Sequence, residues 1–142
     1  MYKIDIAKDF SEYPGLRYCS LSDNSGEEFY HNILNQKFKE ALVNNKKLIV
    51  NLDNTSGFAP SFLDETFGNL IYDFGIKNVE KYIEIISIQE PYWKEMLYQD
   101  TFINWEKRRL DKLRPKVTKK HKEWYRIIND KIIKEVWEQP IV

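Results

Sequence analysis

The hydroxyl of Ser61 stands where a helix is expected to begin, a position suited to phosphate chemistry. An apolar strand over residues 48–50 and a polar loop over residues 53–57 precede it, and apolar residues at helical spacing follow it. A phosphate on Ser61 would meet unpaired backbone N–H groups and the positive end of the helix dipole. The alternative is an ordinary N-cap, which stabilises a helix by about 1 kcal/mol relative to alanine. Asp64 and Glu65 place like charge within one turn, so they favour the N-cap.

Asp53 and Asn54 follow the central strand, where open α/β sheets gather the loops that face ligands. The same two side chains could instead cap the loop by hydrogen bonding to nearby backbone. The stretch 53–57 contains a single glycine, whereas a phosphate-binding loop is glycine-rich. We therefore favour loop capping over nucleotide binding.

Four carboxylates could be imagined as an acid–base or metal cluster: Glu27, Glu28, Asp64 and Glu65. All four fall in the first turns of predicted helices, where capping and the helix dipole explain them without catalysis. His31 and His121 have no metal-ligand spacing around them, and no motif indicates a nucleophile. We expect a protein that is not an enzyme, with no catalytic residue, metal or cofactor.

Strands are predicted over residues 2–6, 16–21, 48–50 and 81–88, from alternating or β-branched apolar residues. Helices are predicted after Ser25, which forms a capping box with Glu28, after Ser61, and from Pro91 onward. Gly75 is expected to end the second helix. This alternation indicates an α/β fold in which the later strands pair in parallel.

Composition indicates a globular protein, since 42% of its 142 residues are hydrophobic and 15% are aromatic. No apolar run approaches the roughly 20 residues that span a bilayer, and no signal peptide is recognisable. The single cysteine, Cys19, lies in an apolar stretch and permits no internal disulfide. These features predict a cytoplasmic protein.

The charge changes sign along the chain. Residues 1–103 carry 10 Lys and Arg against 16 Asp and Glu, whereas residues 104–142 carry 12 against 6. We therefore predict a core domain over residues 1–104 and a basic extension over residues 105–142. An apolar line through Val117, Trp124, Ile128, Ile132 and Val136 predicts an amphipathic helix over residues 116–138 of this extension.

The basic extension offers a nucleic-acid interpretation, because Lys and Arg neutralise phosphates and aromatic rings stack on bases. The candidate contacts are Arg108, Arg109, Lys112, Lys119 and Lys120, which are interleaved with Trp105 and Trp124. The alternative, which the opposed charges favour, is a solvated helix face whose apolar side packs on the acidic core, or a docking face for a partner.

The helix-start motifs resemble the STAS-like domain family of uncharacterised bacterial proteins, which are related in fold to sulfate-transporter and anti-sigma-antagonist domains. The resemblance covers roughly residues 13–100 and rests on Asn24-Ser25-Gly26-Glu27-Glu28-Phe29 and on Ser61-Phe62-Leu63-Asp64-Glu65 with Phe67-Gly68. It implies an α/β sandwich, a mixed sheet of four to five strands covered by helices, here followed by the helical extension.

The resemblance also implies a protein-interaction module in bacterial signalling. In anti-sigma antagonists, a partner kinase, which is itself an ATPase of the histidine-kinase-like type, phosphorylates a serine at the start of the helix after the central strand. Ser61 falls at the matching position, although Ala59-Pro60-Ser61-Phe62 replaces the usual Asp-Ser-Ser-Gly pattern. The expected partner-binding residues lie in the two loops and helix starts: Ser25, Glu27, Glu28, Asp53, Asn54, Ser56, Asp64 and Glu65.

Overall fold

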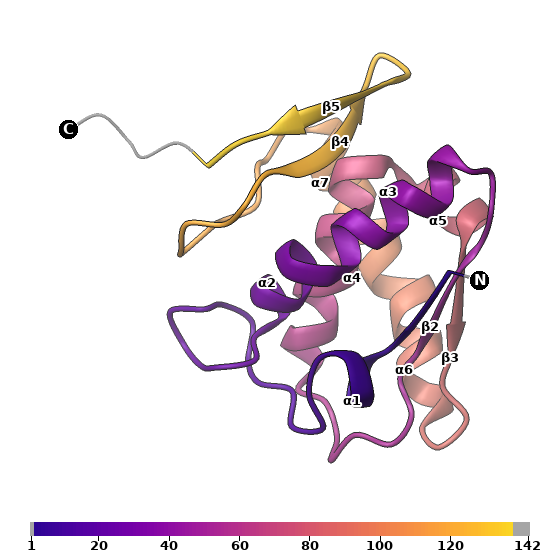
Figure 1. The fold of residues 1–142 in the computed structure, drawn as a ribbon, viewed down its shortest axis with the longest axis vertical. Helices are drawn as coiled ribbons and strands as arrows, with labels where there is room; N and C mark the ends of the chain where they lie inside the picture. The colour runs from indigo at the N-terminus through magenta and orange to yellow at the C-terminus, as the bar shows by residue number, and fades with distance from the viewer. Residues whose placement is uncertain (1, 138–142) are drawn as a thin grey trace.

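Three short parallel strands form the central sheet of the computed structural model, which describes residues 2–137. The strands are β1 (Lys3–Asp5), β2 (Leu48–Asn51) and β3 (Ile83–Ile86), in the order β1-β2-β3 (Figure 1). Ile4 is aligned with Val50, and Val50 with Ile85, so one row of buried side chains crosses the sheet. The parallel arrangement of β2 and β3 agrees with the strand–helix alternation in the sequence.

The predicted strand over residues 16–21 is absent, and with it the mixed sheet of four to five strands. The backbone here bonds to the start of the next helix: Gly26 N–H donates to Leu16 O at 2.9 Å and Glu27 N–H to Arg17 O at 3.0 Å. Leu16 and Leu21 are exposed. The segment forms a loop because its backbone bonds to the start of α2 and not to a strand. β1 leads directly into the short helix α1 (Ile6–Asp9).

The first long helix runs without a break through α2 (Gly26–Phe29), a π-helical turn η1 (Tyr30–Leu34) and α3 (Asn35–Val43). Ser25 is its N-cap, because the Ser25 hydroxyl accepts a hydrogen bond from Glu28 N–H at 3.1 Å. The helix contacts both sheets of the molecule: α3 lies against β2 and against the later strand β4.

The helix α4 (Pro60–Phe74) lies in the centre of the fold and is buried along most of its length. Gly75 ends it with a φ of 83°, as the sequence predicts, and α5 (Ile76–Tyr82) then leads into β3. Phe62, Leu63, Phe67, Leu70 and Ile71 place their side chains in the core.

A third long helix passes through the boundary that composition predicts at residue 104. It consists of α6 (Pro91–Met96), a π-helical turn η2 (Leu97–Thr101) and α7 (Phe102–Leu110). Trp105 is 2% exposed, and its indole packs against Gly68 of α4. The first part of the predicted extension thus belongs to the hydrophobic core.

The predicted C-terminal helix over residues 116–138 is wrong. Its described part contains an antiparallel hairpin of β4 (Trp124–Ile128) and β5 (Lys131–Glu135), and residues 138–142 of the predicted extension lie outside the described chain. Asn129 and Asp130 form the turn with φ values of 52° and 61°. Two residues with positive φ fit a tight hairpin turn, and the β-branched pairs Ile127–Ile128 and Ile132–Ile133 favour strands.

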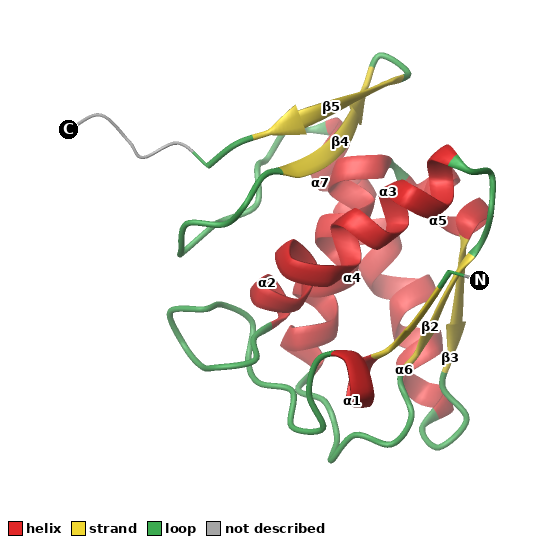
Figure 2. Ribbon diagram, viewed as in Figure 1, coloured by secondary structure: helices red, strands yellow, loops and turns green. Residues whose placement is uncertain are grey.

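The helices separate the two sheets, with the parallel sheet at one end of the molecule and the hairpin at the other (Figure 2). The core forms where α4 meets the other two long helices and the sheet, and Phe29, Phe38, Phe67, Phe102 and Trp105 are among its largest side chains. Within residues 2–137, no helix combines the length and apolar content that a membrane crossing requires.

Candidate functional site

The carboxyl ends of the three strands share one edge of the molecule, and the loops that follow them are tied together there (Figure 1). The carboxylate of Asp53, just beyond β2, accepts hydrogen bonds from Ile88 N–H at 3.0 Å and Gln89 N–H at 2.9 Å. Asn54 and Gln89 bond reciprocally, at 2.7 and 3.0 Å. Asp53 and Asn54 therefore brace the β3–α6 loop.

A pocket of about 150 Å³ opens between these loops, lined by Asp53, Thr55, Ser56, Phe58, Gln89, Trp93 and their neighbours. Phe58 and Trp93 meet edge to face, with ring centroids 6.3 Å apart. Ser56 is exposed, and its N–H donates to Glu12 O at 2.7 Å, which ties the loop after α1 to the same edge.

Ser61 is not the N-cap of α4. The cap is Ala59, Pro60 occupies the first helical position, and no side chain caps this helix end. Proline at the first position sets the start of the helix one residue before Ser61, since its fixed φ already suits helical geometry. The half-buried Ser61 hydroxyl therefore lies in the first turn beside backbone N–H groups that lack a side-chain partner.

The acidic residues near Ser61 are offset by Arg17, which comes from the loop before α2. Its guanidinium lies 2.7 Å from Asp64 Oδ2 and 3.1 Å from Glu65 Oε1. Glu65 is 1% exposed; burial raises the pKa of its carboxyl, while hydrogen bonds from Asn69 and Arg17 act in the opposite direction. Asp64 and Glu65 thus anchor a loop to α4, and Glu65 offers no surface to a partner.

Ser25 and Glu27 are also buried, so the sequence prediction that they form an open contact surface is wrong; Glu28 beside them is half-buried. Glu27 lies in the first turn of α2, where its carboxylate accepts four hydrogen bonds. The donors are Cys19 N–H at 3.0 Å, Thr118 N–H at 3.0 Å, the Thr118 hydroxyl, and His121 Nε2 at 2.7 Å. Burial raises the pKa of Glu27, but the bonds from His121, Thr118 and Cys19 outweigh it and lower the pKa to about 2.

The cluster of Cys19, Glu27 and His121 brings one potential metal-ligand atom from each residue within 4.8 Å of the others. Both carboxylate oxygens of Glu27 are already occupied by two donors each. The cluster therefore has a structural role. We call it the clamp, because its hydrogen bonds fix the segment after α7 to the start of α2. Neither sequence spacing nor a motif indicates it, because Glu27 and His121 are 94 positions apart.

His31 and His121, which the sequence treats as unrelated, stack with ring centroids 4.1 Å apart and planes 10° apart. Burial lowers the pKa of His31 first, and the charge of His121 lowers it further, to about 3. Nδ1 of His31 and Nε of Arg126 are buried without a hydrogen-bond partner among residues 2–137, and both residues line a cavity of about 30 Å³ beside Asp73. Such a cavity can hold one water molecule bonded to these groups.

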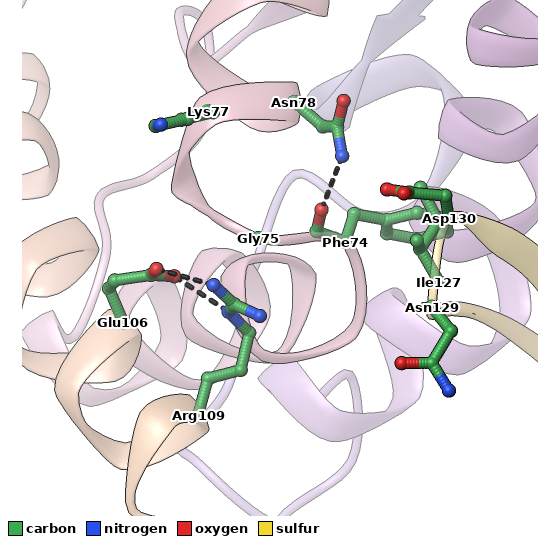
Figure 3. A pocket seen from close by; sticks show the side chains of 9 residues that line it. All are labelled: Phe74, Gly75, Lys77, Asn78, Glu106, Arg109, Ile127, Asn129 and Asp130. Carbon is green, nitrogen blue, oxygen red and sulfur yellow. Dashed lines mark hydrogen bonds and ion pairs between the residues drawn. The ribbon is translucent and has the colours of Figure 1, made fainter.

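The five basic residues of the nucleic-acid prediction do not converge on one site. Arg108 stacks on Trp105 at 4.1 Å, Arg109 pairs with Glu106, and Lys112, Lys119 and Lys120 are exposed. Figure 3 shows Arg109 and Glu106 of α7 bonded to each other at the side of a pocket of about 550 Å³, which Gly75 and the hairpin turn also line. Asp130 also lines this pocket, so its charge is mixed.

Comparison with protein families gives a match over residues 25–93, to the model described as a STAS-like domain of unknown function (DUF4325). This part of the chain is similar to STAS-like domains. The match begins at the N-cap Ser25 and ends at Trp93 in α6, so it contains the carboxyl edge of β2 and β3 and the start of α4. The resemblance seen in the helix-start motifs is confirmed over these residues. Comparisons with curated proteins and with solved structures found no match.

Proposed function

We propose that this protein is a non-enzymatic regulatory module that binds another protein at the carboxyl edge of its parallel sheet. The observation that carries the proposal is a group of apolar side chains on the loops of this edge, three of them exposed and two half-buried. We name it the edge patch, and it consists of Tyr13, Phe58, Ile88, Tyr92 and Trp93. Ile88 is 77% exposed, Tyr13 69% and Tyr92 58%. Apolar residues gathered on a surface in this way are typical of a protein-binding site.

The edge patch stands on a braced support, which reduces the entropy lost on binding. Asp53 holds the backbone at Ile88 and Gln89, and Phe58 packs against Trp93. The bond from Ser56 N–H to Glu12 O holds the loop that carries Tyr13. Polar groups able to do acid–base chemistry, Glu27 and His121, are buried and bonded to each other at a distance from this patch. This arrangement favours recognition over turnover.

Phosphorylation of Ser61 is the regulation that we propose for this surface. The first turn of α4 has no side-chain cap, so a phosphate on Ser61 would lie at the positive end of the helix dipole, although Pro60 has no N–H and Phe62 N–H already donates to Ala59 O. Arg17 offsets the acidic charge of Asp64 and Glu65 nearby. The family resemblance supports an ATPase-type kinase as the partner. Phosphopeptide mapping of the protein from its own cells should find modified Ser61; finding only unmodified Ser61, with Thr55 and Ser56 also unmodified, would refute this regulation.

The binding proposal is tested by co-purification from the native cells with matched variants. Ile88→Glu places a charge in the edge patch, and Val43→Glu places one on another exposed apolar site, at the end of α3, where Val43 is 58% exposed. We expect one protein to co-purify with the wild type and with Val43→Glu, and to be lost with Ile88→Glu. Capture that survives Ile88→Glu would contradict the proposed surface.

Nucleic-acid binding is the second candidate function, and the exposed Lys112, Lys119 and Lys120 favour it. Deleting residues 105–142 would remove Trp105 from the core, so point variants are the cleaner test. A salt-sensitive gel shift of DNA or RNA that is lost in Lys119→Glu with Lys120→Glu would support this function. Retention of the shift in that variant would exclude these lysines as contacts.

A further inference from the structure

The hairpin presents one unpaired strand edge. β4 contacts α3 and α4 on the body of the protein, and β5 pairs with β4 alone among the described strands. In Figure 1, β5 lies on the outer side of β4, away from the helices. An edge strand carries a row of unpaired N–H and C=O groups, which another strand can extend.

The turn determines which backbone groups of β5 face outward. A two-residue turn at Asn129 and Asp130 makes Ile128 and Lys131 a hydrogen-bonded pair of the hairpin. Hydrogen-bonded and non-bonded pairs alternate along an antiparallel ladder, so Lys131, Ile133 and Glu135 direct their N–H and C=O groups toward β4. Ile132 and Lys134 therefore direct theirs to the open edge.

We propose that two copies of this protein associate by antiparallel pairing of β5 with β5 of the partner subunit, about a two-fold axis at Ile133. In this register Ile132 faces Lys134 of the partner subunit, and Lys134 faces Ile132 of the partner subunit. Each of these two pairs exchanges two backbone hydrogen bonds, and the hairpins merge into a four-stranded sheet.

The charges of β5 select this register. Lys131 lies opposite Glu135 of the partner subunit, and the two-fold axis repeats this pair, so opposite charges meet at both ends of the strand. A register centred on Lys134 would place two lysines opposite each other, and a parallel register would place like residues side by side. Lysines protect many edge strands against pairing, but here Glu135 complements Lys131, in addition to its longer contacts with Arg126 at 3.5 Å and Arg114 at 3.8 Å in its own subunit.

A charge-reversal series tests the proposal by sedimentation equilibrium. The wild type should dimerise reversibly at concentrations up to about 1 mM. Lys131→Glu and Glu135→Lys each place like charges opposite each other at both ends, and we expect each to raise the dissociation constant by roughly tenfold or more. An equimolar mixture of the two variants restores two opposite-charge pairs, so it should form heterodimers about as tightly as the wild type.

Two further variants separate pairing from folding. Lys47→Glu makes the same charge change on an exposed lysine before β2 and should dimerise like the wild type. Lys134→Pro removes an outward N–H while sparing the bonds to β4, and should abolish the dimer with the circular dichroism spectrum unchanged. A wild type that stays monomeric at about 1 mM would overturn the proposal. So would a dimer that Lys131→Glu leaves intact, or a mixture of the two reversed variants that stays monomeric.

Discussion

The carboxylate of Glu27 lies 2.7 Å from Nε2 of His121, although 94 positions separate the two residues. The bond fastens the segment that follows α7 to the N-terminal turn of α2, and Thr118 adds two further donors to the same carboxylate. The basic part of the chain is therefore joined to the part that matches the STAS-like model by a buried clamp as well as by the core packing of Trp105.

Replacing Glu27 by alanine should leave buried donors of Cys19 and Thr118 without an acceptor. We expect Glu27→Ala to lower the free energy of unfolding by about 3–5 kcal/mol, because each buried donor left without its acceptor costs about 1–3 kcal/mol. Urea denaturation at neutral pH measures the change. Glu28→Ala is the matched control, because Glu28 is half-buried in the same turn. Equal losses in the two variants would show that the clamp contributes nothing.

As the pH falls, protonation of His31 should destabilise the fold at a higher pH than protonation of Glu27 does. The pKa of His31 is lowered from 6.5 to about 3 in the fold, so the unfolded chain binds more protons and stability is lost as the pH falls from about 6.5 toward 3. The pKa of Glu27 is lowered from 4.5 to about 2, so its contribution is complete above about 4.5 and is lost as the pH falls toward 2.

His31→Phe separates these two groups, because it keeps an aromatic ring beside His121 and cannot be protonated. Burial raises the pKa of Asp73 to about 7, so protonation of Asp73 stabilises the fold as the pH falls below 7 and opposes the effect of His31 in the wild type. We therefore expect the free energy of unfolding of His31→Phe to rise relative to that of the wild type as the pH falls from 6.5 to 4.5. Urea denaturation at three pH values across this range gives the comparison. Parallel pH profiles of the two proteins would show that His31 does not contribute to the acid sensitivity.

Close contact between α4 and α7 depends on the absence of a side chain at Gly68. A Cβ atom there would lie 2.1 Å from Trp105 Cε2, which is far inside contact distance. Gly68→Ala should therefore cost about 3 kcal/mol or more, at the upper end for overpacked cores. If the clash with Trp105 is the cause, adding Trp105→Phe should recover part of the stability that Gly68→Ala loses. Thermal denaturation in which the stability losses of the two substitutions simply add would contradict the clash.

Asp53 should be the residue that holds the β3–α6 loop in place. Asp53→Ala leaves Ile88 N–H and Gln89 N–H without their acceptor, and we expect a loss of about 1–3 kcal/mol in stability. Hydrogen exchange at these two amides should accelerate more than at core amides of β2. Asp53→Asn retains one acceptor oxygen and should fall between the wild type and Asp53→Ala. Unchanged exchange in Asp53→Ala would show that the loop is held by other contacts.

Sequence patterns predict the elements whose signals are local. Ser25 predicts the start of α2, Gly75 predicts the end of α4, and the β-branched run near Ile85 predicts β3. The hairpin is missed because the apolar residues of 116–138 also fit helical spacing, while the turn signal at Asn129 and Asp130 is confined to two residues. Sequence periodicity cannot choose between these interpretations without the tertiary contacts that β4 makes with α3 and α4.

The candidate site is predicted in part for the same reason. Asp53 and Asn54 follow a strand, so their position at the sheet edge can be inferred from the sequence. The burial of Glu27 and Glu65 depends on Arg17, Thr118 and His121, which reach them from distant segments. The edge patch is missed because Tyr13, Ile88 and Tyr92 belong to three separate loops or helix starts.

Photo-crosslinking in the native cells tests recognition at the sheet edge most directly. A benzoylphenylalanine at Tyr92 lies in the edge patch, and one at Val43 occupies a site of equal 58% exposure at the end of α3. We expect a discrete protein adduct from position 92 that is lost when Ile88→Glu is added, and none from position 43. No adduct at position 92, or the same adducts from both positions, would contradict partner binding at this edge.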